Sequence, residues 1–479
     1  MNVLAIDQGT SSTKALVVGE GRAILGSAEV AVHPTVLPDG GIEQDPEELW
    51  RSVVDAARMA LDSSGVSADA VGLANQGETV LAWDHESGAP LSTAMSWQDR
   101  RAIYVTNRLR GRAEELRGLT GLPMDPYFAA PKMTRMRECT TREGVVTTTD
   151  AWLIHRLTGA FATDIATASR TLLLDLDTGT WSSTALEAFD LAREALPAIV
   201  PSAGVVGETS AFGPVLPLAG VIVDQQAALF GEACHAPGDS KCTFGTGAFL
   251  LANAGGSARR SRSGLAACVA WRVGDVTTYC LDGQVYTAGA AVTWLRDIGL
   301  LAGPGDLDTF ASRVPHAGDV VFVPGLAGLA APFWQPGARG AFVGLSLGTS
   351  KHHLVRSVVD GIAASVAWVA KAAGNDLGSP LTRLRVDGGL TRSTALMQAE
   401  ADLLQVPVEV YPTAHATALG VAALTRYGMG DVAGAIELAT AWTPSATYEP
   451  VISADEAAGR LDRWRSAALA TIEFVRRES

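Results

Sequence analysis

Three aspartates that follow short apolar runs are the residues of this chain best suited to chemistry. The first, Asp7, ends the apolar run at residues 3–6 and precedes a bend of Gly, Ser and Thr at residues 9–12. Such a bend offers backbone N–H groups to an anion, and a carboxylate at its edge can hold a metal ion beside that anion. An ordinary turn capped by Asp7 would have the same sequence, so the bend alone leaves both interpretations open.

The other two aspartates lie further along the chain. Asp224 follows the apolar residues 221–223 and precedes a helix predicted at 225–232, and Asp387 begins a late Asp-Gly-Gly turn. An aspartate between a strand and a helix can act as a general base. It can also be a plain N-cap, which would stabilise the helix by only about 1 kcal/mol.

A second bend like the first lies near the middle of the chain. Residues 242–251 again form an apolar run, a bend of Gly and Thr, and another apolar run. Such runs joined by turn residues predict hairpins, and the return of the pattern at about half the chain length predicts two similar domains. Pro237 and Gly238 interrupt the chain between them. We therefore expect domains at residues 1–233 and 234–479.

Helices are expected between the strands. Asp45, followed by proline, has the sequence of a helix N-terminus. Residues 97–118 are predicted to be helical, and we interpret their arginines, Arg100 and Arg101 among them, as a solvated face. Strands that alternate with capped helices indicate an α/β architecture.

Composition narrows the class of protein. The 479 residues carry a formal net charge of −14, which disfavours nucleic acid and anionic membranes as partners. Five cysteines without paired spacing argue against a disulfide framework and fit a cytoplasmic location. No signal peptide is expected, and no membrane insertion, because Pro and Gly interrupt the longest apolar tract at 320–334.

Known nucleotide motifs are missing from the sequence. It contains no Gly-Lys-Ser/Thr loop and no Gly-x-Gly-x-x-Gly that opens a βαβ unit. The ordered set of bends, aspartates and polar segments instead resembles the FGGY carbohydrate kinases, among them the glycerol kinases. The resemblance runs along nearly the whole chain, through residues 7–12, 75–79, 96–101, 125–128, 220–231, 244–247, 340–345 and 386–389.

This resemblance implies a fold and a reaction. The fold is α/β, with two actin-like (ribonuclease H-type) domains and a cleft between them. The reaction is ATP-dependent phosphorylation of a primary hydroxyl of a small polyol or sugar, and glycerol is the first candidate for this acceptor. Asp224 would be the general base. Asp7 would hold Mg²⁺ through water, because Mg²⁺ keeps much of its hydration shell.

The resemblance also assigns binding residues by position. Carboxylates and amides suit the hydroxyls of a neutral polyol; the implied substrate-binding residues are Glu78, Trp97, Tyr127, Asp224, Gln225 and Phe249. The implied nucleotide-binding residues are Thr10, Ser11, Ser12, Lys14, Thr246, Gly289, Thr293, Gly389 and Ser393. Core packing is the alternative role for Trp97 and Phe249, and a solvated strand lysine is the alternative for Lys14.

Departures from the glycerol kinase pattern bear on specificity. Gly77 stands where those enzymes have Arg. The substitution removes the forked hydrogen-bond donors of a guanidinium from one end of the pocket and leaves room there. A second interpretation is therefore a kinase of another triose, a tetritol or a ketose, such as dihydroxyacetone, erythritol or a xylulose-like sugar. Thr293 and Ser393 replace Gln and Asn at two nucleotide positions. The basic loop that binds an allosteric sugar bisphosphate is not recognisable at 208–217, so that regulation is not expected.

A third interpretation belongs to another class, a non-catalytic actin-like ATP-binding protein. Such a protein has no need of Glu78, Tyr127 and Gln225 around Asp224, so the substrate wall favours the kinase. The sequence leaves open whether the chain forms a homo-oligomer.

Overall fold

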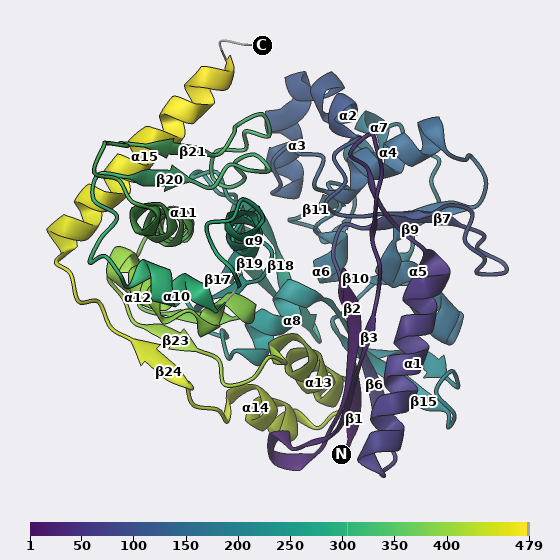
Figure 1. Ribbon diagram of the computed structural model, residues 1–479. Coiled ribbons are helices and arrows are strands. Elements are labelled where there is room, and N and C mark those ends of the chain that lie inside the picture. Colours follow the sequence, from purple (N-terminus) through teal and green to yellow (C-terminus); the bar gives the residue numbers. More distant parts are fainter. Residues whose placement is uncertain (304, 477–479) are drawn as a thin grey trace.

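The computed structural model describes residues 1–303 and 305–476, which form two α/β halves on one mixed sheet (Figure 1). In spatial order the first half of the sheet is β3 (Ile24–Ala31), β2 (Ser12–Val18), β1 (Val3–Gln8), β6 (Ala70–Asn75), β15 (Leu216–Val223) and β14 (Ala203–Thr209). The second half continues with β18 (Ala266–Val273), β19 (Val276–Val285), β17 (Ala248–Gly255), β16 (Ser240–Phe244), β22 (Leu384–Asp387), β23 (Val408–Val410) and β24 (Ala446–Tyr448).

The two halves repeat one arrangement of strands. In each, a hairpin (β1–β2 or β16–β17) is antiparallel, and its first strand pairs in parallel with a later strand, β6 or β22. The halves meet in the sheet at a single residue pair, Ala203 opposite Val273. Both predicted hairpins and the predicted α/β class are confirmed.

Helices cover both faces of the first half. Along β1, Leu4 and Ile6 pack in one core with α1 (Pro46–Ser64). Val3 and Ala5 pack in another core with α13 (Ala416–Gly428). Figure 1 shows α13 beside β1, although more than 400 residues separate them in the sequence. The first half of the sheet is therefore completed by a helix from the far end of the chain.

The remaining helices and strands surround these layers. The helices in the first half are α2 (Ile103–Arg108), α3 (Ala113–Thr120), α4 (Ala129–Cys139), α5 (Thr149–Thr158), α6 (Ile165–Ala168), α7 (Ser183–Ala188) and α8 (Asp224–Gly231). Those in the second are α9 (Gly289–Asp297), α10 (Asp306–Ala311), α11 (Lys351–Leu377), α12 (Thr394–Leu404), α14 (Val432–Thr440) and α15 (Ala454–Arg476). A smaller sheet joins β4 (Thr35–Val36), β5 (Ile42–Gln44), β8 (Ala94–Met95), β7 (Val80–Trp83) and β9 (Val145–Thr148).

The prediction of a single helix at residues 97–118 is wrong. The chain turns after β8, and α2 and α3 are separated by the 3₁₀ turn Arg110–Arg112. Arg100 and Arg101 do not form a solvated face either. Arg101 Nη2 lies 2.7 Å from Asp99 Oδ2 and 2.6 Å from Glu43 Oε1, and Arg100 pairs with Asp125 at 3.3 Å. Two of the three carboxylates, Glu43 and Asp125, lie outside the segment, so the spacing of residues within it could not reveal them.

Helix α11 is long and apolar enough to cross a membrane, with a mean hydropathy of 1.2. However, 72% of that apolar window is buried inside the protein. Its residues contribute to the core of the second half, together with α15, which packs Leu461, Trp464 and Ala468 against it. This is the packing of a core helix.

The crossing of α13 with α8 generates a stability prediction. A Cβ at Gly420 would lie 1.8 Å from Ala227 O, so Gly420→Ala must push the two helices apart. We expect the free energy of unfolding to fall by about 2–3 kcal/mol in urea titrations. The control is Gly459→Ala in α15, where a Cβ meets nothing within 4 Å; it should raise stability by up to about 1 kcal/mol. Equal effects of the two substitutions would contradict this packing.

Candidate active site

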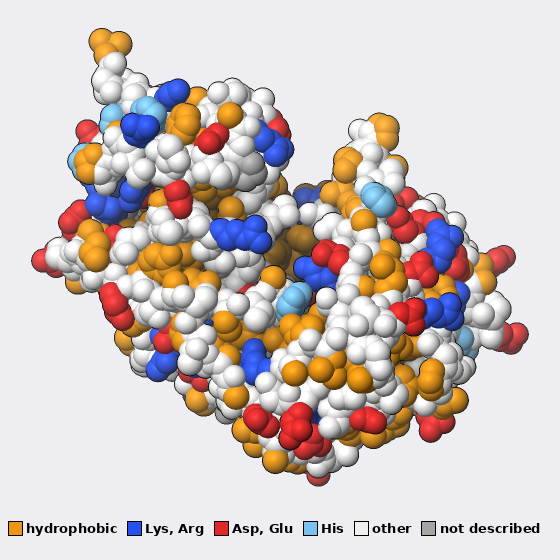
Figure 2. Space-filling model, turned by 60° about the horizontal axis from the view of Figure 1, so that its bottom comes forward, with side chains coloured by type: hydrophobic (Ala, Val, Ile, Leu, Met, Phe, Trp, Pro, Cys, Tyr) orange, Lys and Arg blue, Asp and Glu red, His pale blue; other side chains and the backbone are white. Residues whose placement is uncertain are grey.

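A cavity of about 1010 Å³ lies between the two hairpin bends. Figure 2 shows the surface hollowed between two raised parts. Most of the predicted site residues line this cavity: Asp7, Thr10, Ser11, Ser12, Lys14, Glu78, Trp97, Tyr127, Asp224, Gln225, Thr246, Phe249 and Gly389. Residues from positions 7 to 389 thus converge on one space.

Hydrogen bonds fix the first bend, residues 9–12, to the cavity wall. Gly9 N donates to Ser12 O at 3.0 Å, which closes the turn. Thr10 Oγ1 donates to Gln76 Oε1 at 3.2 Å and accepts from Trp97 Nε1 at 2.8 Å. The bend is therefore fixed before any ligand binds, which reduces the ordering cost of binding an anion there.

The second bend has a similar closure. Gly245 N donates to Gly247 O at 2.9 Å, and Ala288 N donates to Thr246 O at 3.0 Å. Gly289 supports this bend from behind, because a Cβ there would lie only 2.6 Å from Gly245 O. Helix α9 begins directly against the bend and holds it in place.

Two carboxylates lie between the bends, at the ends of β1 and β22. Burial raises the pKa of Asp7 to about 6; Lys14 opposes this shift and Asp387 adds to it. Asp387 Oδ1 is buried and accepts no hydrogen bond from the described residues. Within residues 1–303 and 305–476, no group of three or more His, Cys, Asp or Glu side chains is placed to hold a metal ion. The pair suits Mg²⁺, which takes one or two carboxylates and keeps its remaining ligands as water or phosphate oxygens.

Asp224 begins α8 at the carboxyl end of β15. Its Oδ1 accepts a hydrogen bond from Gln225 N at 2.6 Å, which fixes the carboxylate. Burial raises the pKa of Asp224 to about 6; the charge of Asp7 adds to this rise and Lys241 opposes it. A carboxylate tuned in this way stays ionised at neutral pH and is a better proton acceptor than an exposed one.

Lys241 is fully buried under this aspartate. Its Nζ donates to Gln225 Oε1 at 2.7 Å and to Thr243 Oγ1 at 2.6 Å. The ammonium therefore positions Gln225 as well as favouring ionised Asp224. We did not predict Lys241, although a lysine inside the apolar run of a predicted hairpin is a sequence signal for a buried partner.

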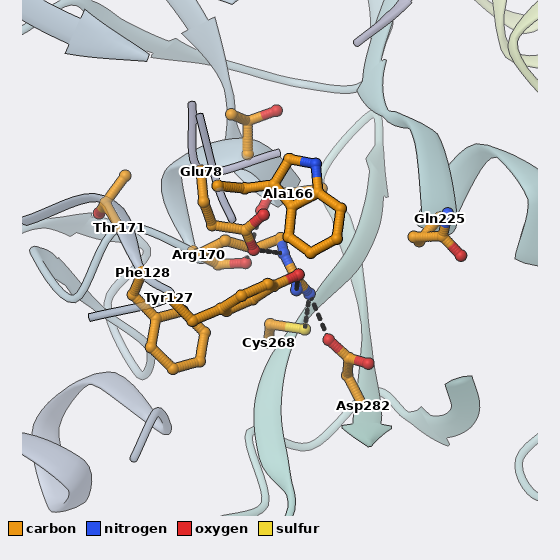
Figure 3. A network of polar contacts seen from close by, with 12 residues as sticks. Glu78, Tyr127, Phe128, Ala166, Arg170, Thr171, Gln225, Cys268 and Asp282 are labelled. Atoms are coloured by element: carbon orange, nitrogen blue, oxygen red, sulfur yellow. Dashed lines mark hydrogen bonds and ion pairs between the residues drawn. The ribbon is translucent and has the colours of Figure 1, made fainter. Parts of the chain in front are cut away.

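Glu78 lies at the same end of the cavity as Asp224, in the turn between β6 and β7. Its backbone has a positive φ of 55°, a conformation that non-glycine residues rarely adopt and that is often retained for function. Arg170 Nε donates a short hydrogen bond to Glu78 Oε1, and Arg170 Nη2 donates to Tyr127 OH at 3.2 Å (Figure 3). Burial raises the pKa of Glu78 to about 7, opposed by Arg170 and then Lys132.

Gly77 removes the guanidinium expected at that position, but another guanidinium, from a distant part of the chain, lies beside it. A Cβ at Gly77 would lie 3.1 Å from Val223 Cγ2 and 3.6 Å from Arg170 Nε. Arg170 therefore occupies the space beside the glycine. No sequence signal marked Arg170, because its partners are distant in sequence and no local pattern surrounds it.

Aromatic rings form the apolar side of the same end. Trp97 contacts Tyr127 and Phe249 edge-on, with ring centroids 5.8 Å apart in both pairs. Trp97 and Phe249 are only partly buried and face the cavity. Core packing alone does not account for their exposure to the cavity, whereas a wall for a carbon chain does.

Three predicted nucleotide residues lie outside the described lining of the cavity: Gly289, Thr293 and Ser393. Thr293 is exposed on α9. Ser393 caps α12 and donates a short hydrogen bond to Asp308. Their contact with nucleotide stays a prediction.

Comparison with known proteins agrees with this geometry. Residues 2–231 match the N-terminal domain, and residues 240–429 the C-terminal domain, of the FGGY family of carbohydrate kinases. A glycerol kinase of Ralstonia pickettii (strain 12J) is 40% identical, with 97% of each chain covered.

Two solved structures share the fold. The chain is similar to Plasmodium falciparum glycerol kinase with ADP, at 28% identity and a TM-score of 0.90, with 98% of each chain covered. A ligand-bound xylulose kinase from Lactobacillus acidophilus has a TM-score of 0.86 at 22% identity, with 97% of this chain and 96% of that chain covered. The α/β fold of two halves around a cleft and the predicted kinase class are confirmed, and the chain belongs to the FGGY family of carbohydrate kinases.

Proposed function

We propose that this protein transfers the γ-phosphoryl group of ATP to a primary hydroxyl of glycerol. One observation carries the proposal: both bends, Asp224 and a wall of polar and aromatic side chains line the same cavity. Phosphoryl transfer needs donors around the phosphates at one end and an oriented alcohol in line at the other. The similarity to glycerol kinases along nearly the whole chain favours glycerol among the small polyols.

Asp224 is the proposed general base. Its carboxylate takes the proton of the hydroxyl as the alcohol oxygen forms a bond to the γ-phosphorus. The bond from that phosphorus to the oxygen it shares with the β-phosphate breaks, and ADP leaves. Gln225 N fixes one oxygen of the carboxylate, so the base is oriented before the alcohol arrives.

The remaining roles follow from position along the cavity. Glu78 accepts from the hydroxyls of the acceptor, Tyr127 and Gln225 also hydrogen-bond to them, and Trp97 and Phe249 pack against its carbons. At the other end, Lys14 and the two bends donate to the phosphates; the residues involved are Thr10, Ser11, Ser12 and Thr246, with Gly389 toward the nucleoside.

Asp7 and Asp387 are the residues that would hold Mg²⁺. Both line the cavity, they repel each other, and one oxygen of Asp387 has no hydrogen bond among the described residues. When bound, Mg²⁺ neutralises phosphate charge.

We also propose a division of the chain near residues 233 and 234, and a cytoplasmic enzyme that neither binds nucleic acid nor inserts into membranes. The gap between the two family matches, from 231 to 240, supports the boundary. Five free cysteines, four of them buried, suit a reducing compartment.

The test of function is an ADP-release assay over polyols and ketoses of three to six carbons. We expect Mg²⁺-dependent release that is fastest with glycerol and lost when the metal is chelated. Faster turnover of a tetritol or a ketose would replace glycerol with that acceptor. Release that no acceptor stimulates would overturn the kinase assignment.

The proposed base has its own test. Asp224→Asn should lower polyol-dependent ADP release by about 10²–10⁴-fold, the range for loss of a general base. ADP affinity, measured by calorimetry, should stay unchanged because Asp224 lies at the acceptor end. Asp55→Asn, on the exposed face of α1, is the control and should retain full activity. Turnover at the wild-type rate in Asp224→Asn would remove Asp224 from this role.

The pKa of Asp224 predicts a pH dependence. Because the base must be ionised and its pKa is raised to about 6, activity should be constant above pH 7 and fall about tenfold per unit below pH 6. Since Asp7 titrates in the same range, this limb belongs to the coupled pair. Melting temperatures between pH 5 and 8 show whether unfolding contributes. A rate that does not change down to pH 5 would contradict the assignment.

A further inference from the structure

A buried cluster of charges joins the two halves of the protein at the acceptor end of the cavity. Arg170, in the turn that follows α6, lies between Glu78 of the first half and Asp282 on β19 of the second (Figure 3). Its Nη1 lies 2.6 Å from Asp282 Oδ2, and its Nε forms the short contact with Glu78 Oε1. The three side chains are at most 3% exposed, so water contributes little to their orientation.

Arg170 uses all three of its nitrogens in different directions. Besides the two carboxylates, Nη2 donates to Tyr127 OH, and Nη1 also contacts Cys268 Sγ at 3.6 Å. A planar guanidinium can satisfy this arrangement, whereas the single ammonium of lysine cannot reach all of these partners at once. The fork therefore fixes the relative positions of Glu78 and Tyr127.

The bonds to Arg170 also determine what Glu78 and Tyr127 can offer a ligand. The ion pair uses Oε1 of Glu78, and Oε2 accepts no hydrogen bond from the described residues. The phenolic oxygen of Tyr127 accepts from Arg170, so its own proton is free to be donated. One acceptor and one donor therefore face a cavity that Arg170 itself lines.

The same guanidinium limits the space beside Gly77. It lies 3.6 Å from the position of a Cβ at residue 77, and Val223 lies on the other side of that position. Because Gln284 Nε2 donates to Asp282 Oδ2 at 2.6 Å and holds it in place, the guanidinium is anchored from the second half. An acceptor longer than the pocket would have to displace it.

We propose that Arg170 is the positioning residue that sets acceptor specificity, by aligning Glu78 with Tyr127 and by closing the pocket beside Gly77. This inference rests on the proposed polyol kinase function. The competing role is purely structural: a buried ion pair between the halves whose loss would lower stability and leave the choice of acceptor unchanged.

The test uses Arg170→Lys, which keeps the positive charge but loses the planar set of N–H donors of the guanidinium. KM and kcat are measured for glycerol and for erythritol, with ADP affinity and melting temperature alongside. We expect the KM for glycerol to rise about tenfold or more, the cost of misaligning one charged hydrogen bond. The preference for glycerol over erythritol in kcat/KM should fall about threefold or more as the pocket loosens. ADP affinity should not change.

The matched control is Arg137→Lys in α4. Arg137 Nη2 lies 2.6 Å from Glu194 Oε1, and this pair is mostly buried but outside the cavity. It should leave both KM values and the acceptor preference as in the wild type.

A second variant protects the test against misfolding. Asp282→Asn keeps the contact between Arg170 and Glu78 and weakens only the distal anchor, so it should raise the KM for glycerol with ADP affinity retained. Unchanged KM and acceptor preference in a folded Arg170→Lys, or failure of both variants to fold, would overturn the proposal in favour of the structural role. A wild-type enzyme without polyol kinase activity would instead refute the proposed function.

Discussion

Repulsion among carboxylates that share one cavity is the constraint on which the site depends. Asp7, Asp224, Asp387 and Glu78 all line this cavity, and burial raises the pKa of Asp7, Asp224 and Glu78. The acceptor end has two cations of its own: Lys241 opposes the rise in the pKa of Asp224, and Arg170 pairs with Glu78. At Asp7, Lys14 opposes the rise in pKa and Asp387 adds to it. Lys241 and Arg170 thus balance the negative charges at the acceptor end. The negative charges of Asp7 and Asp387 are less well balanced, and they lie where phosphates and a divalent cation would meet.

The two halves divide the work of holding a ligand. The first contributes one bend, the base and Glu78; the second contributes the other bend and the Asp387 turn. In the sheet itself the halves meet at one residue pair, Ala203 and Val273. The buried ion pair between Arg170 and Asp282 is a further connection, and it lies against the acceptor pocket. A contact that joins the halves is therefore also a contact that shapes the pocket.

Prediction from the sequence succeeded where a feature is defined by a few adjacent residues. The hairpin bends, the aspartate at the end of β15 and the start of α1 each follow from a few adjacent residues, and they could be predicted. It failed where partners are distant. Arg101 was assigned to solvent because Glu43 lies 58 residues away, and Arg170 was missed because Glu78 and Asp282 are 92 and 112 residues away. The side chain beside Gly77 belongs to Arg170, and no residue near Gly77 in the sequence predicts its presence there.

Helix α13 has a consequence for how the protein is made. It covers the face of β1 that carries Val3 and Ala5, yet it ends at Gly428. During synthesis at about 5–20 residues per second, roughly 20–80 seconds pass between the emergence of β1 and that of α13. Throughout that time an apolar sheet face has no native cover. The first half therefore reaches its final packing only when translation is nearly finished.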